Sequence, residues 1–262
     1  MSSSSARKLL GKRALVTAGA QGIGLAISSH LLAAGCDVFV HYRSSAAGAK
    51  ELATEAAALG RRFASASADL TSTEGCNPLV AEAVAFLGGL DILINNAGSL
   101  VGRRTLPDAD DEFWSEVMSL NVGSLRRITR AAAPHLIESA KTRGGASIVN
   151  LSSLAGRKGG HAGSLAYSTA KGAVLTFSRA LANELGPQGV RVNAIAPGLI
   201  LGTSFHNTHT TAASAQATIA GIPLGRAGHA DDVARAAVFL ASEFDGFITG
   251  ATLDINGGVY SA

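Results

Sequence analysis

The stretch Arg13-Ala14-Leu15-Val16-Thr17-Ala18-Gly19-Ala20-Gln21-Gly22-Ile23-Gly24 decides the fold of this chain. Residues 13–17 are a short, mostly apolar run that predicts a buried strand, and residues 25–34 have a helical pattern. A strand, a glycine turn and a helix in this order form the context that a dinucleotide-binding loop needs. Glycines let the backbone approach a pyrophosphate, and the helix start offers unpaired N–H groups and a positive dipole end. Taken alone, the turn is also compatible with a simple connection between a strand and a helix.

The rest of the chain repeats this alternation. Apolar runs predict strands at residues 13–17, 37–43, 62–68, 90–94, 146–151, 190–195 and 251–254. Helical patterns fall between them, at residues 25–34, 46–59, 73–87, 111–137, 163–185 and 231–241. The alternation predicts an α/β fold with a parallel sheet covered by helices on both faces. Right-handed crossovers then give a Rossmann-type, doubly wound sheet of about seven strands.

Length and composition indicate one large domain. The 262 residues are 47% hydrophobic and 16% charged, which suits a substantial core, and we expect a single domain over residues 12–262. Residues 1–11 begin with a polar, serine-rich segment that has no apolar stretch of the signal-peptide kind. We interpret residues 1–11 as a disordered tail rather than a short transit peptide.

Several classes of partner are excluded by the same composition. The net charge is only +3, and no dense block of Lys and Arg is interleaved with aromatics, so nucleic acid is not an expected partner. No apolar run reaches about 18 residues, so no membrane-spanning helix is expected. Cys36 and Cys76 suggest no disulfide framework, which fits the reducing cytoplasm. His206 and His209 have no cluster of Cys or carboxylates nearby, so no metal site is expected.

Polar or glycine residues follow six of the predicted strands. They are Gly19–Gly24, Arg43, Asp69, Asn95–Gly98, Ser153 and Pro197–Gly198. In an open parallel sheet, ligands bind beyond the carboxyl ends of the strands. We therefore expect these residues to surround the functional site.

Tyr167 and Lys171 lie four residues apart in the predicted helix 163–185. This spacing puts both side chains on one helix face, a turn apart. A tyrosine has a pKa of about 10, and an ammonium within reach commonly lowers it by ~1–3 units. The pair therefore indicates a tuned proton-transfer group. The alternative for this spacing alone is a surface tyrosine beside a solvated lysine.

The end of the second predicted strand bears on the choice of cofactor. NAD-binding enzymes usually place Asp or Glu about 20 residues beyond the glycines, to bond the ribose 2′-OH. Here that place holds His41, Arg43 and Ser44, with no acid. Arg43 and Ser44 are suited to a 2′-phosphate, which favours NADP. An ordinary exposed arginine at a strand end is the alternative.

Taken together, these motifs resemble the short-chain dehydrogenase/reductase family. The resemblance runs from about Lys12 to Gly258. The matching motifs, in order, are Thr17-x-x-x-x-Gly22-Ile23-Gly24, Asp69, Asn95-Asn96-Ala97-Gly98, Asn121, Ser153, Tyr167-x-x-x-Lys171 and Pro197-Gly198. The resemblance implies a cytoplasmic homodimer or homotetramer that interconverts a carbonyl and a secondary alcohol by hydride transfer from or to NAD(P).

The resemblance also implies a role for each motif residue. Tyr167 would exchange a proton with the substrate oxygen, and Lys171 would lower the tyrosine pKa and hold the nicotinamide ribose. Ser153 would hydrogen-bond the substrate oxygen, and Asn121 would hold a water on a proton path toward Lys171. The cofactor contacts it implies are Gly19, Gln21, Gly22, Ile23, Gly24, His41, Arg43, Ser44, Asp69, Leu70, Asn95, Ala97, Gly98, Tyr167, Lys171, Pro197, Gly198, Ile200 and Thr203.

Three positions leave alternatives open. Ala18 replaces the first glycine of the family's usual start, and a methyl group there would shift the first turn slightly. Gln21 stands where many NADP-preferring relatives carry Arg or Lys, so NAD also remains a candidate cofactor. Ser152 competes with Ser153 for the role of the serine that contacts the substrate.

The substrate is indicated only by its class. Residues 199–223 are polar and are expected to cover the active site. Basic residues lie close to the expected cleft: Arg103, Arg104, Arg157, Lys158 and His161. They favour an anionic or polyhydroxylated ketone such as a sugar, a uronate-derived keto acid or a 3-oxoacyl thioester, although loop arginines in solvent would give the same pattern. A nucleotide-binding sensor without turnover is a further alternative, which the complete catalytic set disfavours.

Overall fold

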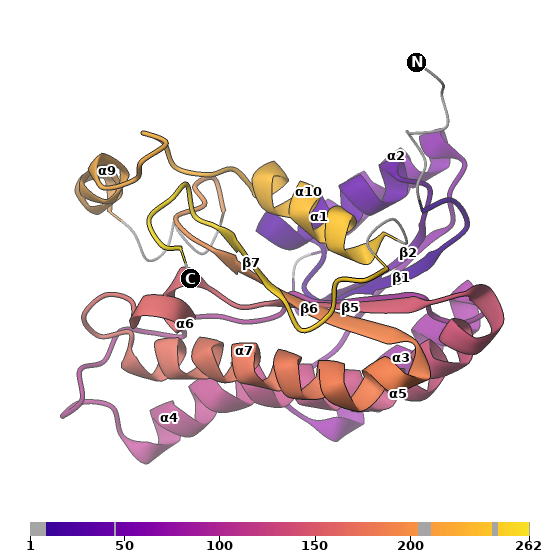
Figure 1. Ribbon diagram of the computed structural model, residues 1–262, viewed down its shortest axis with the longest axis horizontal. Coiled ribbons are helices and arrows are strands. Elements are labelled where there is room, and N and C mark those ends of the chain that lie inside the picture. The colour runs from indigo at the N-terminus through magenta and orange to yellow at the C-terminus, as the bar shows by residue number, and fades with distance from the viewer. Residues whose placement is uncertain (1–8, 45, 204–210, 243–245, 262) are drawn as a thin grey trace.

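The computed structural model describes residues 9–44, 46–203, 211–242 and 246–261, which build one parallel sheet between two layers of helices (Figure 1). The strands are β1 (Arg13–Val16), β2 (Asp37–Tyr42), β3 (Phe63–Ser67), β4 (Ile92–Asn95), β5 (Ala146–Leu151), β6 (Val190–Pro197) and β7 (Thr252–Ile255). Within the described residues they form a seven-stranded sheet in the order β3-β2-β1-β4-β5-β6-β7, with all neighbours parallel. The order turns back on itself between β1 and β4, the position where such sheets bind ligands. The predicted doubly wound fold is confirmed.

Helices cover both faces of the sheet (Figure 1). One layer contains α1 (Gly22–Ala33), α2 (Ala47–Leu59) and α10 (Ala230–Ala241), and the other contains α3 (Thr73–Leu87), α4 (Asp111–Met118), α5 (Ser124–Arg143) and α7 (Leu165–Leu185). Two short helices, α6 (Leu154–Lys158) and α9 (Ala212–Ala220), lie at the end of the molecule where the C-terminus also lies. Among the described residues, no helix has the length and apolar character to cross a membrane.

The strand pattern explains why two separate cores form. Successive side chains of a strand point to opposite faces of the sheet. In β1, Val16 packs among α1, α2 and α10, whereas its neighbour Leu15 packs among α3 and α5. Both are fully buried, as expected for a parallel sheet covered on both sides. The core therefore holds the strand ends, and the site beyond them, in a fixed frame.

Some element boundaries differ from the predictions. The stretch 111–137, predicted as one helix, is α4 and α5 joined by a π-helical turn, η2 (Ser119–Gly123). A π-turn adds one residue to the helical ladder and leaves the apolar pattern almost unchanged, so it escaped the prediction. Neither α6 nor α9 was predicted, because helices of five and nine residues are too short for a clear period.

The predicted disordered tail, residues 1–11, includes three residues, 9–11, that the structure shows packed on the domain. Leu9 is buried, and its N–H donates to the carbonyl of Ala34 at 3.1 Å. Gly11 likewise donates to the carbonyl of Gly35 at 3.0 Å. Residues 9–11 are therefore ordered by packing on the end of α1, and only residues 1–8 of the predicted tail lie outside the described residues.

Candidate active site

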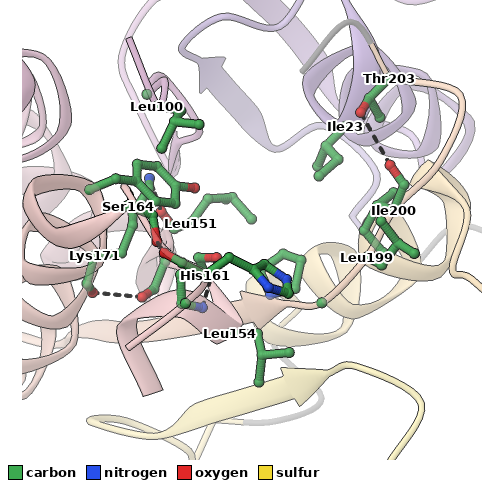
Figure 2. A pocket seen from close by; sticks show the side chains of 18 of the residues that line it. Ile23, Leu100, Leu151, Leu154, His161, Ser164, Lys171, Leu199, Ile200 and Thr203 are labelled. Atoms are coloured by element: carbon green, nitrogen blue, oxygen red, sulfur yellow. Dashed lines mark hydrogen bonds between the residues drawn. The ribbon is translucent and has the colours of Figure 1, made fainter. Parts of the chain in front are cut away.

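A cavity of about 1100 Å³ lies at the carboxyl ends of β1, β4, β5 and β6. Eleven of the predicted site residues line it: Gln21, Gly22, Ile23, Gly98, Ser153, Tyr167, Lys171, Pro197, Gly198, Ile200 and Thr203. Figure 2 shows Ile23, Ile200 and Thr203 on one side of the cavity and Leu100, Ser164 and Lys171 on the other. The sequence motifs thus meet around one space although they are spread over most of the chain.

Tyr167 and Lys171 lie on α7 and face the same space, as their spacing predicts. The Lys171 Nζ is 5.8 Å from the centre of the Tyr167 ring and donates a 2.9 Å hydrogen bond to the carbonyl of Leu151, the last residue of β5. Lys171 is only 4% exposed, and its burial lowers its pKa to about 8. The end of β5 and the start of α7 are therefore tied together at the site.

The predicted lowering of the tyrosine pKa is wrong in sign. Burial raises the pKa of Tyr167 to about 12, and a side-chain hydrogen bond with Ser153, which favours the phenolate, only partly offsets this rise. A buried phenolate loses the water that would stabilise it. This loss of hydration is the larger of the two effects on the group. Tyr167 is therefore held as a neutral hydroxyl, the form that can donate a proton.

The two competing serines have different partners. The Ser152 Oγ donates to the carbonyl of Lys171 at 2.7 Å and is buried against α7. Ser153 lies at the start of α6, where its Oγ accepts a 3.1 Å hydrogen bond from the N–H of Ala155 and contacts the Tyr167 hydroxyl. The structure thus places Ser153 beside the tyrosine and uses Ser152 to join β5 to α7.

Asn121 lies in the π-helical turn η2 and does not line the cavity itself. Its Oδ1 accepts from the N–H of Ser99 at 3.1 Å, and its Nδ2 donates to the carbonyls of Ser99 at 2.8 Å and Val117 at 2.9 Å. A Cβ on Gly98 would lie 2.6 Å from the Asn121 Oδ1 and 2.8 Å from the Lys171 Nζ. Gly98 therefore separates the two side chains, and Asn121 fixes the loop that follows β4.

The glycine-rich loop is built for close approach by a ligand. A Cβ on Gly24 would lie 2.2 Å from the carbonyl oxygen of Ala18, so only glycine fits there. The Asn96 Nδ2 holds the same turn through 3.1 Å hydrogen bonds to the carbonyls of Thr17 and Ala18. In the described structure, Gln21 at the start of α1 makes no side-chain capping hydrogen bond. The first N–H groups of α1 are thus left for an anion, which fits the pyrophosphate of a dinucleotide.

His41, a predicted cofactor contact, is held by the backbone around the glycine-rich loop. The ring is buried, its Nδ1 accepts from the N–H of Ala18 at 3.0 Å, and its Nε2 lies 3.0 Å from the carbonyl of Ala68. Both nitrogens are therefore used by the backbone, and burial lowers the pKa of the imidazole so that it stays neutral. His41 therefore braces the loop, and its contact with a cofactor stays a prediction. Arg43 and Ser44, which follow it, are exposed at the end of β2.

The other residues predicted to contact the adenosine half differ in their burial. Asn95 is buried and donates to the Thr129 Oγ1 at 3.0 Å and the Asn150 Oδ1 at 2.9 Å, so it braces the sheet. Asp69 is exposed, and hydrogen bonds from Thr71 lower its pKa. The other predicted contacts that do not line the cavity are Gly19, Gly24, Arg43, Ser44, Leu70 and Ala97.

The basic residues near the site divide into two groups. Arg103, Lys158 and His161 line the cavity, and Figure 2 shows the His161 ring projecting between its two sides. Arg104 does not line it, because its Nη1 pairs with the Asp110 Oδ2 at 2.9 Å and its guanidinium lies over Phe113. Arg157 is likewise paired, with Asp254 at 2.9 Å. The predicted set of five is thus reduced to three in the cavity wall.

Several cavity residues escaped the sequence analysis. They are Ser99, Leu100, Val101, Ser164, Ser214, Ala217, Thr218 and Val259. Three of them, Ser214, Ala217 and Thr218, belong to α9, within the stretch 199–223 that was expected to cover the site. Residues 204–210 of that stretch, with His206 and His209, lie outside the described residues. Across the described part of the chain, no group of His, Cys, Asp and Glu has the arrangement of a metal site.

Comparisons with known proteins agree with this geometry. A family model described as "Enoyl-(Acyl carrier protein) reductase" matches residues 17–260. An acetoacetyl-CoA reductase from Shinella zoogloeoides is 38% identical over 250 residues, which cover 94% of this chain and 98% of that protein.

Two solved structures are similar over nearly their whole length. One is an NADH-dependent reductase, A1-R′, responsible for alginate metabolism; it is 34% identical with a TM-score of 0.89, over 98% of this chain and 100% of the other. The second is a short-chain dehydrogenase from Burkholderia cenocepacia J2315 in complex with NADP, also 34% identical, with a TM-score of 0.88 over 97% and 100% of the two chains.

A dinucleotide-binding sheet with a tyrosine, a lysine and a serine at one cavity defines the class of NAD(P)-dependent oxidoreductases. Within that class, the chain belongs to the short-chain dehydrogenase/reductase family. It is therefore an oxidoreductase acting on carbonyl and alcohol groups of small molecules, as the resemblance implied.

Proposed function

We propose that this enzyme reduces a polar, anionic ketone with NADPH, using Tyr167 as the acid. The observation that carries this proposal is the meeting of Tyr167, Ser153 and Lys171 at a cavity wall that contains cationic side chains and, among the described residues, no Asp or Glu. The nicotinamide, when bound, supplies or accepts the hydride. The residues of the chain must then orient the ketone and supply its proton.

Each residue has a step that follows from its place. The Tyr167 hydroxyl, kept neutral by burial, donates its proton to the ketone oxygen. The Ser153 hydroxyl accepts from the N–H of Ala155 and is hydrogen-bonded to Tyr167, so it lies where its proton can turn to the same ketone oxygen and stabilise the charge that develops there. The charged form of Lys171 stabilises the phenolate left behind and is placed to hold the ribose. Asn121 fixes the loop between these groups, and we extend its role to holding a water near Lys171.

The preference for NADPH rests on the end of β2. Arg43 and Ser44 are exposed there, and the buried His41 before them is neutral and bound to backbone. A 2′-phosphate would be met by a guanidinium and a hydroxyl, and no carboxylate directly follows the strand. We expect Arg43→Ala to raise the KM for NADPH about tenfold and to leave that for NADH within about twofold. Equal changes for the two cofactors would contradict the preference.

The anionic substrate rests on the charges in the wall. Arg103, Lys158 and Lys171 line the cavity, together with His161. A relative named for acetoacetyl-CoA and a structural neighbour named for alginate metabolism support this class, since CoA carries phosphates and alginate is a polymer of uronic acids. Both a 3-oxoacyl thioester and a uronate-derived keto acid carry negative charge that would pair with the basic side chains of the cavity wall.

A matched pair of ketones tests the charge. Acetoacetate and methyl acetoacetate share the reacting carbonyl and differ in one negative charge. We expect the wild type to prefer acetoacetate, and Arg103→Met or Lys158→Met to lower kcat/KM for acetoacetate about tenfold while the ester changes less than about twofold. Arg104→Met, outside the cavity wall, is the matched control. Equal kcat/KM for both ketones in the wild type and in all three variants would contradict the proposal of an anionic substrate.

The assembly is proposed to be a homodimer or homotetramer in the cytoplasm. The long helices α5 and α7 are the candidate pairing surfaces, because family members usually associate through these elements. Light scattering at micromolar concentration tests this assembly, and a monomer mass would contradict it.

A further inference from the structure

Two walls of the cavity come from segments far apart in the chain. Ser153 and α6 form one wall, which includes Lys158. The residues after β7 form another, to which Val259 contributes. Figure 1 shows α6 close to the C-terminal end of the chain. What joins these two walls therefore sets the shape of the substrate space between them.

One ion pair makes this connection. The Arg157 Nε donates to the Asp254 Oδ1 at 3.1 Å and its Nη2 donates to the Oδ2 at 2.9 Å, across 97 residues of sequence. The two side chains are only 13% and 17% exposed, so water screens the pair weakly. The same guanidinium lies 5.7 Å from the centre of the Tyr260 ring, within the range of a cation–π contact. Arg157 thus contacts both β7 and the segment that follows it.

Each wall is a short segment of chain. α6 has only five residues, and an isolated helix of that length is not stable in water. In the C-terminal segment, the Asn256 Oδ1 accepts from the N–H of Gly258 at 3.0 Å and the Asn256 Nδ2 donates to the carbonyl of Tyr260 at 3.0 Å. The segment is also tied to the stretch before α10, because the N–H of Leu224 donates to the carbonyl of Gly257 at 3.1 Å. A two-pronged arginine–carboxylate pair has a fixed geometry that can hold two such segments at one distance.

We propose that Arg157 is a positioning residue that acts through Asp254 and Tyr260. It fixes α6, and with it the direction of the Ser153 hydroxyl, and it fixes the Val259 wall that limits the size of the substrate. Arg157 does not itself bind the anionic substrate, because Asp254 neutralises its charge. The kinetic consequences rest on the proposed function, whereas the structural consequence does not.

The structural consequence is tested by hydrogen–deuterium exchange on the full-length protein. We expect Arg157→Met and Asp254→Asn to speed amide exchange in peptides covering residues 153–158 and 256–261 between about threefold and tenfold. Arg157→Lys keeps the charge but loses the two-pronged guanidinium, so its exchange rates should fall between those of these variants and the wild type. Arg235→Met, which removes an exposed partner of Asp232 on α10, is the matched control and should leave both peptides unchanged.

Kinetics with acetoacetate and NADPH separate positioning from general destabilisation. Displacement of Ser153 should lower kcat, and loss of the Val259 wall should raise KM, each between about threefold and tenfold in Arg157→Met, with partial recovery in Arg157→Lys. Faster exchange in only one of the two peptides, or in neither, would overturn the proposal. Unchanged kcat and KM in Arg157→Met would do the same. A wild type that reduces no ketone would contradict the proposed function, and the exchange experiment would still decide the role of Arg157.

Discussion

The ammonium nitrogen of Lys171 lies 5.8 Å from the centre of the Tyr167 ring and bonds the carbonyl of Leu151. Burial acts on the two groups in opposite directions. It lowers the pKa of the lysine to about 8 and raises that of the tyrosine to about 12. Near neutral pH the phenol therefore keeps its proton, whereas the charge of the lysine is lost as the pH rises through about 8.

This difference predicts the pH dependence of ketone reduction. We expect kcat/KM to be flat below about pH 7 and to fall above about pH 8, because neutral Lys171 no longer stabilises the phenolate formed when Tyr167 gives up its proton. Steady-state rates from about pH 6 to 10 check this. Lys171→Arg keeps its charge and should lose the decline, and Tyr167→Phe should lose about 10²–10⁴-fold in rate at every pH. A wild-type rate that rises above pH 8 would contradict the assignment.

A second prediction concerns Ala18, whose backbone has a φ of +48°. A left-handed conformation costs an L-residue roughly 1–2 kcal/mol, and glycine avoids that cost but loses about 0.5–1 kcal/mol of chain entropy on folding. We expect Ala18→Gly to raise the free energy of unfolding slightly, by about 0.5 kcal/mol, with little change in the KM for NADPH. Ala34, with a φ of −73°, is the control, and Ala34→Gly should destabilise by about 0.5–1 kcal/mol. Urea unfolding measures the free energy of unfolding of both variants. If the two glycine substitutions lowered it equally, the backbone at Ala18 would not be strained.

Local patterns predicted much of this molecule. Strand runs and helical periods gave the order of elements, and the spacing of Tyr167 and Lys171 gave their shared face. The sign of the tyrosine pKa shift was missed because burial depends on segments distant in sequence. The bracing role of His41 was missed for the same reason, since its partner Ala68 lies on another strand end. Arg157 was assigned to the substrate because its carboxylate partner lies 97 residues away.

A third prediction concerns Asp91, at the opposite end of the sheet from the cavity. This carboxylate is 1% exposed and accepts from the Arg13 Nε and Nη2, each at 2.9 Å, and from the Ser139 hydroxyl, while Arg143 lies 3.2 Å away. Burial alone would raise the pKa of Asp91, but the hydrogen bonds from Arg13 and Ser139 together lower it. Asp91→Ala should therefore destabilise by about 3–5 kcal/mol, because it leaves the Arg13 charge partly buried and unpaired.

The same carboxylate predicts an acid dependence of stability. Because its folded-state pKa is lowered, its contribution is complete above the ordinary aspartate value of about 4 and is lost as the pH falls through the lower folded value. Urea unfolding at about pH 7 and 3 should show the gap between wild type and Asp91→Ala narrowing in acid. At pH 7 the folded variant should keep its kcat, because the pair lies far from the cavity. If the difference in free energy of unfolding between wild type and Asp91→Ala widened in acid, the stabilising role of the Asp91 carboxylate would be contradicted.

The last prediction concerns Val101, in the loop after β4. Its φ is +64°, and the N–H of Gly102 bonds the carbonyl of Leu100 at 2.7 Å, so Val101 is the central residue of a three-residue turn that is rare and strained. A β-branched side chain is an outlier there. Its side chain packs against the cluster that contains Phe113 and Val117, and Leu100 and Arg103 on either side line the cavity. The strained turn thus directs two cavity residues toward the substrate.

At Val101, the usual order of stability, in which an alanine variant is more stable than a glycine variant, should be reversed. Elsewhere glycine is less stable than alanine by about 0.5–1 kcal/mol, but here only glycine relieves a strain of roughly 1–2 kcal/mol. We therefore expect Val101→Gly to be as stable as Val101→Ala or more stable in urea unfolding. Its kcat/KM should nevertheless be the lower of the two, because the flexible turn no longer fixes Leu100 and Arg103. If Val101→Gly were the less stable variant by 0.5–1 kcal/mol, the turn would carry no strain, and its conformation would need no functional explanation.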